Sequence, residues 1–256
     1  MVGLPHGGLD HVVARRVFAD RFGRRWWLPF LAGYLTLAAG VLFAWHVVPT
    51  VMLTVFLLLS IAHFGAEDAA VGGDTSVAAL LAYGGVPVVV PALAHPGEVG
   101  RIFAVLTGSG GGHVLRLAEG PIAAIWLLSI GVVAWRRIRS TDRRRKGMIE
   151  LGGTIVLFAT ATPLTAFAIY FAVVHTPRAF ASLQKSLTVA ERHRLVARSL
   201  PLAVAGILAG AALFLVRSTA SVSDGLVSAI FFLLSALTMP HMWLSWLSGR
   251  RHQVIE

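Results

Sequence analysis

The sequence predicts an all-α integral membrane protein, a polytopic helical bundle with eight to nine transmembrane spans. Of its 256 residues, 56% are hydrophobic and only 13% are charged. A soluble domain carries about 25% charged residues. Apolar runs long enough to cross a bilayer recur to the C-terminus, whereas a cleavable signal would occur once near the start. We therefore expect one integral domain over residues 1–256, multi-pass in the cell membrane.

The expected spans differ in length and regularity. The first is short and polar. Gly84-Gly85, Pro87 and Pro91 in the fourth permit close packing and local kinks. Pro163 separates the short sixth span from the seventh, because proline disfavours helix in the residue before it. The nine ranges are residues 2–17, 26–46, 48–66, 75–95, 114–135, 148–162, 163–182, 199–217 and 224–248.

Basic residues decide between eight and nine spans. They cluster after the first, fifth, seventh and last spans. With nine spans all four clusters lie on one side, which is cytoplasmic by the positive-inside rule. Merging the sixth and seventh spans would put the middle clusters on opposite faces, so nine is favoured. The net charge of +10 then indicates loops beside anionic lipid, and we expect membrane lipid as a partner and no nucleic acid.

Four histidines lie inside apolar stretches: His6, His63, His175 and His241. Imidazoles at membrane depth are costly to desolvate and usually face an interior cavity. Any one of them is explained equally well by a hydrogen bond to a neighbouring helix. Four at a similar depth favour a shared role. Cysteine is absent, so a metal would take nitrogen and oxygen ligands, and the sequence predicts an intramembrane metal site.

Charged residues accompany these histidines: Asp10, Glu67, Asp68 and Arg178. Asp10 follows His6 by four residues, and Glu67 follows His63 by four, so each pair shares a helix face. Such a carboxylate either orients the second ring nitrogen of a ligating imidazole or ligates the metal itself. Spacing alone leaves both roles open. We expect Arg178 to pair with a carboxylate.

The segments around the histidines resemble the signature blocks of the Brp/Blh family of integral membrane β-carotene 15,15′-dioxygenases. The blocks occur in the family's order from the third residue to near the C-terminus, and four separate blocks make a specific signal. They are GLPHGGLD at 3–10, IAHFGAED at 61–68, YFAVVHTPRAF at 170–180 and LTMPHM at 237–242.

The resemblance implies a non-haem Fe(2+) site and oxygen-dependent cleavage of the central double bond of β-carotene to two retinals. By motif, His6, His63 and His175 would bind the iron, and His241 would lie beside the ligands or in the substrate cavity. The family pattern has one further histidine, at the position of Ala179 here. Family members usually carry more apolar residues before the first block, so we expect the first span to be incomplete.

A polyene substrate would enter sideways from the bilayer into an aromatic tunnel. No protein nucleophile or acid–base pair is required for this oxygen-dependent cleavage. Each tunnel candidate taken alone is explained at least as well as a core or lipid-facing aromatic. The candidates are Phe167, Tyr170, Phe171, Trp243 and Trp246.

Two other functions stay open. Ala179 favours a catalytically impaired relative that binds carotenoid or retinal without cleaving it. A small transporter would also use intramembrane histidines and carboxylates, although the chain lacks the paired broken helices of inverted repeats. For the enzyme we expect β-carotene or a related carotenoid and dioxygen as partners, with a functional link to a retinal-binding rhodopsin.

Overall fold

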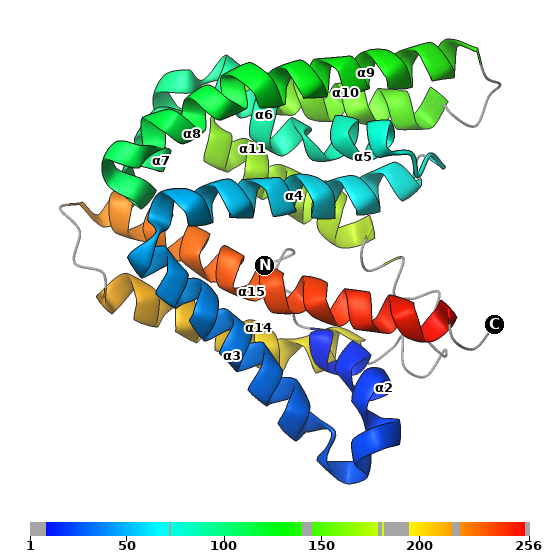
Figure 1. Cartoon of the computed structure of the whole chain (residues 1–256), viewed down its shortest axis with the longest axis vertical. Coiled ribbons are helices and arrows are strands. Elements are labelled where there is room, and N and C mark those ends of the chain that lie inside the picture. The colour runs from blue at the N-terminus through cyan, green and yellow to red at the C-terminus, as the bar shows by residue number, and fades with distance from the viewer. Residues whose placement is uncertain are drawn as a thin grey trace. The chain divides into compact units, whose positions relative to one another are not determined.

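A computed structural model describes residues 9–71, 73–139, 145–178, 181, 195–216 and 221–253. Every regular element among these residues is helical, which confirms the predicted all-α class. The helices fall into two compact units (Figure 1), Met1–Val48 with Leu183–Glu256, and Pro49–Ser182. The single domain expected over residues 1–256 stays a prediction.

In the first unit, α15 packs against each of the other three α-helices. The indole of Trp45 donates to Ser235 Oγ at 2.7 Å and lies 4.6 Å from the ring of Phe232, which ties α3 to α15. Gly33 leaves room for the ring of Trp243, because a Cβ atom there would lie 2.9 Å from it. The elements are α2 (Asp10–Phe22), the 3-10 turn η1 (Gly23–Arg25), α3 (Trp27–Val47), α14 (Leu195–Val216) and α15 (Val222–Gln253).

The second unit surrounds a buried core to which Tyr83, Trp126, Phe158 and Tyr170 belong. The Trp126 indole donates to the backbone oxygen of Ala82 at 3.0 Å, which joins α9 to α5. The elements are α4 (Pro49–Val71), α5 (Val77–Gly84), α6 (Val86–Ala94), α7 (Pro96–Thr107), η2 (Gly108–Gly110), α8 (Gly111–Leu117), η3 (Ala118–Ile122), α9 (Ala123–Ile138), α10 (Arg145–Thr160), α11 (Pro163–Ile169) and η5 (Tyr170–His175).

Helices α4 and α5 pack at close range through glycines. A Cβ atom on Gly65 would meet the backbone carbonyl of Leu80, and one on Gly84 would meet the backbone of Ile61. Small residues let membrane helices approach closely. The packing role expected for the Gly84-Gly85 pair is therefore confirmed for Gly84, and it fixes α5 against the helix that carries His63, Glu67 and Asp68.

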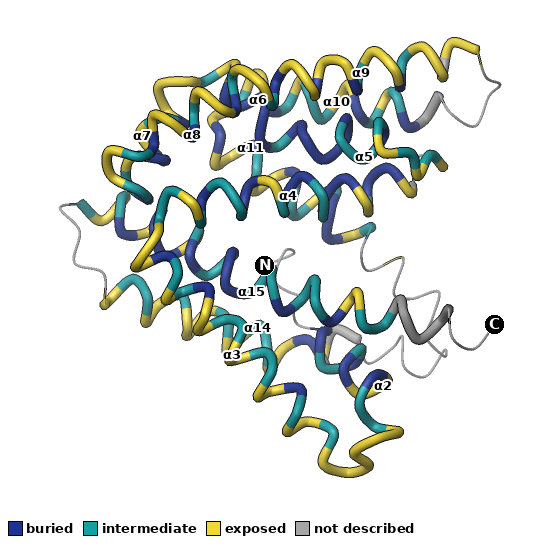
Figure 2. The backbone as a smooth tube through the Cα atoms, viewed as in Figure 1, coloured by how far each residue is buried: buried dark blue, intermediate teal, exposed yellow. Residues whose placement is uncertain are grey.

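Among the described residues, five helices are long and apolar enough to cross a membrane, and a sixth candidate is the pair Val77–Gly84 and Val86–Ala94, bent by 48°. Exposed residues lie along these helices (Figure 2), and many of them are apolar, as on lipid-facing helices. The five are Trp27–Val47, Pro49–Ala70, Pro96–Arg136, Ser199–Val216 and Val222–Ser248.

The eight to nine spans predicted from the sequence are therefore not shown. Helix α10 ends at Thr160 and α11 begins at Pro163, so the expected break is confirmed, but the described part of α10 is shorter than a full span. Residues 96–107, which no expected span includes, join the expected fifth span in one helical run of 41 residues. This happens because the 3-10 turn η2 links α7 directly to α8.

Replacing Gly84 by alanine tests the close approach of α4 and α5. The added methyl group overpacks a backbone contact, and we expect the thermal midpoint in detergent to fall by on the order of 5 °C. Gly131 on α9 is the matched control, because a Cβ atom there meets nothing within 4 Å. Gly131→Ala is expected to leave the midpoint unchanged or to raise it. Equal midpoints in both variants would contradict the packing.

Candidate metal centre

Two elements of the second unit bring three possible metal ligands together. His63 and Glu67 lie one turn apart on α4 and so share a face, as their spacing predicts. His175 ends η5. One ligand atom from each of the three residues lies within 4.8 Å of the other two. His175 Nδ1 is 3.5 Å from Glu67 Oε2, and the imidazole centroids are 5.4 Å apart.

The cluster is buried on one side and accessible on the other. His175 is fully buried, whereas the Glu67 side chain is 31% exposed. Phe64 meets the His175 ring edge-on at a centroid distance of 4.7 Å, and Phe171 stacks on it at 5.3 Å. These rings exclude water around His175 and leave Glu67 as the side from which a small molecule could approach.

His175 sits at the end of a π-helical turn. The wider turn of η5 runs over Tyr170–His175, and such turns are frequent at functional sites. A second π turn among the described residues, η3, contains Pro121, which lacks an N–H group and so disturbs the helical hydrogen bonds. At η5 the proline is Pro177, two residues past the turn, and it cannot donate to the carbonyl of Val173 four residues back, inside the turn. Side-chain contacts on both sides of the turn hold it as well.

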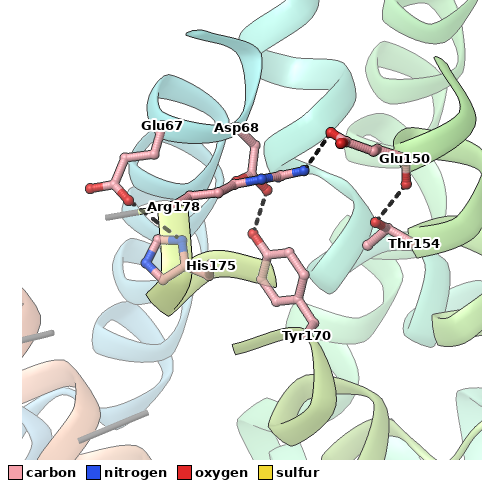
Figure 3. A network of polar contacts seen from close by, with 7 residues as sticks. All are labelled: Glu67, Asp68, Glu150, Thr154, Tyr170, His175 and Arg178. Carbon is pink, nitrogen blue, oxygen red and sulfur yellow. Dashed lines mark hydrogen bonds and ion pairs between the residues drawn. The ribbon is translucent and has the colours of Figure 1, made fainter. Parts of the chain in front are cut away.

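Those contacts converge on the buried carboxylate of Asp68 (Figure 3). Tyr170 donates from its hydroxyl to Oδ2 at 2.7 Å. Arg178 pairs with Oδ1 at 2.8 Å and reaches Glu150 Oε2 on α10 at 2.7 Å. The expected pairing of Arg178 with a carboxylate is confirmed. Since His175 lies between Tyr170 and Arg178 in the chain, α4 and α10 together fix its backbone.

A separate polar cluster lies inside the first unit. His241 Nδ1 is 2.6 Å from Asp10 Oδ1, and the Tyr34 hydroxyl donates to Asp10 Oδ2 at 3.0 Å. Asp10 itself is only 2% exposed. A carboxylate bonded to Nδ1 fixes the tautomer and orientation of an imidazole and directs Nε2 away from itself. Asp10 is thus placed to orient His241. The partner expected from the spacing, His6, lies outside the described residues.

The structure describes some of the remaining predicted site residues and not others. His6 and Ala179 lie outside the described residues. In the second unit, Phe167 stacks on Phe171 with a centroid distance of 5.8 Å. In the first, Trp243 lies 6.1 Å from Phe18, and Trp246 is 52% exposed. The aromatic tunnel stays a prediction.

Sequence reasoning missed two residues of these clusters. Glu150 carried a usable signal, since it is an acidic residue inside the apolar stretch 148–162, and such residues are functional candidates by default. Tyr34 carried none. A tyrosine in an apolar run is ordinary, and its bond to Asp10 depends on tertiary packing.

Apolar helices long enough for several membrane crossings, with a partly buried histidine–carboxylate cluster, define a multi-pass membrane protein with a candidate metal site. A sequence model of the family described as "Beta-carotene 15,15'-dioxygenase" matches residues 1–248. The chain therefore belongs to the β-carotene 15,15′-dioxygenase family, whose members are oxidoreductases, and the resemblance of the four histidine blocks is confirmed.

Two relatives match nearly the whole chain. A "Beta-carotene 15,15'-dioxygenase" from uncultured marine bacterium 66A03 is 31% identical over 260 residues, which cover 95% of this chain and 88% of the relative. A "Probable beta-carotene 15,15'-dioxygenase Blh" from Halobacterium salinarum is 24% identical over 283 residues, covering 96% of this chain and 82% of the relative. No solved structure matches the chain.

Removing either imidazole of the cluster is expected to weaken metal binding. We expect His63→Ala and His175→Ala each to raise the dissociation constant for Co(II) at least about tenfold, because each deletes a candidate ligand. Titration of purified protein in detergent, followed by Co(II) absorbance, measures this. His46→Ala is the control, since His46 is exposed at the end of α3. Unchanged affinity in both cluster variants would rule the cluster out.

Proposed function

We propose that the chain cleaves the central 15,15′ double bond of β-carotene with dioxygen, at a ferrous ion held within the membrane. One double bond breaks, and each of its two carbons receives one oxygen atom, so that C40H56 and O2 become two molecules of retinal, C20H28O. The observation that carries the proposal is the convergence of His63, Glu67 and His175 in a chain of this family.

The donor set fits ferrous iron. Two imidazoles and one carboxylate with open positions are typical of non-haem Fe(II) oxygenases. A bound ferrous ion would supply the electrons and the coordination positions that dioxygen requires. The sequence left Glu67 either as a ligand or as a support for one. The separation of at most 4.8 Å among the three ligand atoms supports the ligand role.

Glu67 also compensates for the missing histidine of the family pattern. A ligand from α4 would serve in place of the imidazole that Ala179 lacks. His6 is carried over from the sequence resemblance as a further ligand. The Co(II) titration extends to it: His6→Ala is expected to weaken binding like the other two histidine variants.

The surrounding residues bind and orient and are not required to move protons. Oxygen-dependent cleavage of a carbon–carbon double bond transfers no proton to or from the protein. Phe64 and Phe171 present apolar faces at His175, which suit a polyene and keep water from reactive intermediates. Phe167 extends this aromatic surface, whereas the tunnel roles of Trp243 and Trp246 rest on the sequence.

The substrate and its products are apolar, which is why we place the enzyme in the cell membrane with lateral entry from the bilayer. The eight to nine spans expected from the sequence belong to this proposal. So does a functional link to a retinal-binding rhodopsin, which would consume the product. Membership in an oxidoreductase family leaves the transporter alternative without support.

Expression in cells that accumulate β-carotene tests the reaction. With iron and air supplied, we expect the orange colour to fade and retinal to appear in extracts analysed by chromatography. His175→Ala, verified in the membrane at the same level, should leave the colour intact because it lacks a ligand. His46→Ala should behave like the native chain. Native protein present in the membrane with intact colour and no retinal would reject the proposal.

The competing candidate is a relative that binds carotenoid or retinal without cleaving it, and Ala179 is the observation that favours it. Ala179→His separates the two. If Glu67 serves as the ligand, the added imidazole should change the rate of retinal formation by less than about threefold, below the effect expected of even a supporting residue. A native chain without cleavage that gains it in Ala179→His would establish the impaired relative.

A further inference from the structure

Glu150 belongs to the polar network in Figure 3 and is connected to Asp68 through Arg178. It lies on α10 and contacts Arg178 at 2.7 Å. The arginine in turn contacts Asp68, the neighbour of Glu67 in the chain. An acidic side chain in an apolar membrane stretch is costly to bury, and such residues usually have a function. We therefore expect a function of Glu150 besides joining α10 to Arg178.

We propose that Glu150 is a positioning residue that, through Arg178, tunes the cluster for a divalent cation. This role rests on the proposed function, because the cation is the one that His63, Glu67 and His175 would hold. Sharing one guanidinium between Glu150 and Asp68 leaves a net negative charge beside the cluster, and this charge is what a divalent ion requires there.

Formal charges on the described residues support this. Two neutral imidazoles and the single negative charge of Glu67 would leave a bound divalent ion with one unit of positive charge. Asp68 and Glu150 carry two negative charges against the one positive charge of Arg178, which leaves one unit of negative charge. The two excesses cancel. In surroundings of low dielectric constant, an uncompensated charge is strongly unfavourable.

Glu150 is the residue of this network whose charge can be removed without removing a contact of Asp68. Asp68 is committed on both oxygens, to Tyr170 and to Arg178. Glu150 meets Arg178 through the other terminal nitrogen of the guanidinium. Without the carboxylate on α10, Arg178 and Asp68 would form a neutral pair, and the compensating charge would disappear while the cluster kept all its ligands.

A purely structural ion pair predicts something different. It would affect folding but leave metal affinity unchanged once the protein is folded. Charge compensation predicts that affinity follows the net charge of the network, whichever residues supply it. The double variant Glu150→Gln/Arg178→Gln keeps the original net charge, through Asp68, and the amide placed at position 178 can still donate a hydrogen bond to that carboxylate.

The test titrates the purified full chain, free of iron, with Co(II) in detergent. We expect Glu150→Gln to raise the dissociation constant about tenfold, the loss typical of residues behind a metal ligand. Glu150→Asp keeps the charge and should stay within about threefold of the native chain, and so should Glu150→Gln/Arg178→Gln. Glu98→Gln is the matched control, because it removes the same charge from the exposed surface of α7 in the same unit.

Folding is checked by the thermal midpoint of each variant. Folded Glu150→Gln with native Co(II) affinity would overturn the role of Glu150 alone. If that variant does not fold, Glu150→Asp that binds Co(II) at least about tenfold more weakly than the native chain, although it keeps the charge, overturns the proposal equally. A native chain that binds no Co(II) would overturn the metal site and this role together, so the two failures are distinguishable.

Discussion

The buried carboxylate of Asp68 is the interaction on which the candidate centre depends. It accepts a hydrogen bond from Tyr170 and forms an ion pair with Arg178. These two residues lie on either side of His175 in the chain. A carboxylate in this environment must be paired, because an unpaired buried charge is strongly destabilising.

The same pairing holds the π turn of η5 in place and presents His175 to the face of α4 that carries His63 and Glu67. The contacts that stabilise the buried Asp68 carboxylate therefore also set the position of His175.

The sequence predicted the parts of this centre that follow from helix periodicity or from a motif. The four-residue spacing of His63 and Glu67 placed both on one face, and the histidine blocks identified His175 and the family. The pairing of Arg178 with a carboxylate also followed from the cost of a cation among apolar residues. The contact between Arg178 and Glu150 did not follow, because it depends on where α10 packs. The π turn did not follow either, because Pro177 signals a disturbed helix without specifying its form. The spacing paired Asp10 with His6 and left its role open, whereas the structure places Asp10 against His241, 231 positions away in the chain and beyond the reach of spacing arguments.

A similar boundary applies to the fold. Hydropathy identified the helical segments and proline identified the break before Pro163, since both are local properties. It did not predict the bend of 48° between α5 and α6 or the continuous helical run of 41 residues. Apolar runs look alike whether a helix crosses the bilayer, lies buried against its neighbours, or continues through a tight turn such as η2. The number of crossings is a property of the assembled bundle, and composition constrains it only loosely.

The proposed metal ion occupies the cluster formed by α4 and η5. An anomalous-difference map, collected at the iron edge from crystals of the iron-loaded protein, would locate it most directly. We expect a single strong peak within coordination distance of His63, Glu67 and His175, about 2.0–2.2 Å from each donor atom by analogy with other metals bound by imidazole and carboxylate. A peak elsewhere in the chain, with clear density for the three side chains and no metal between them, would contradict the proposed site.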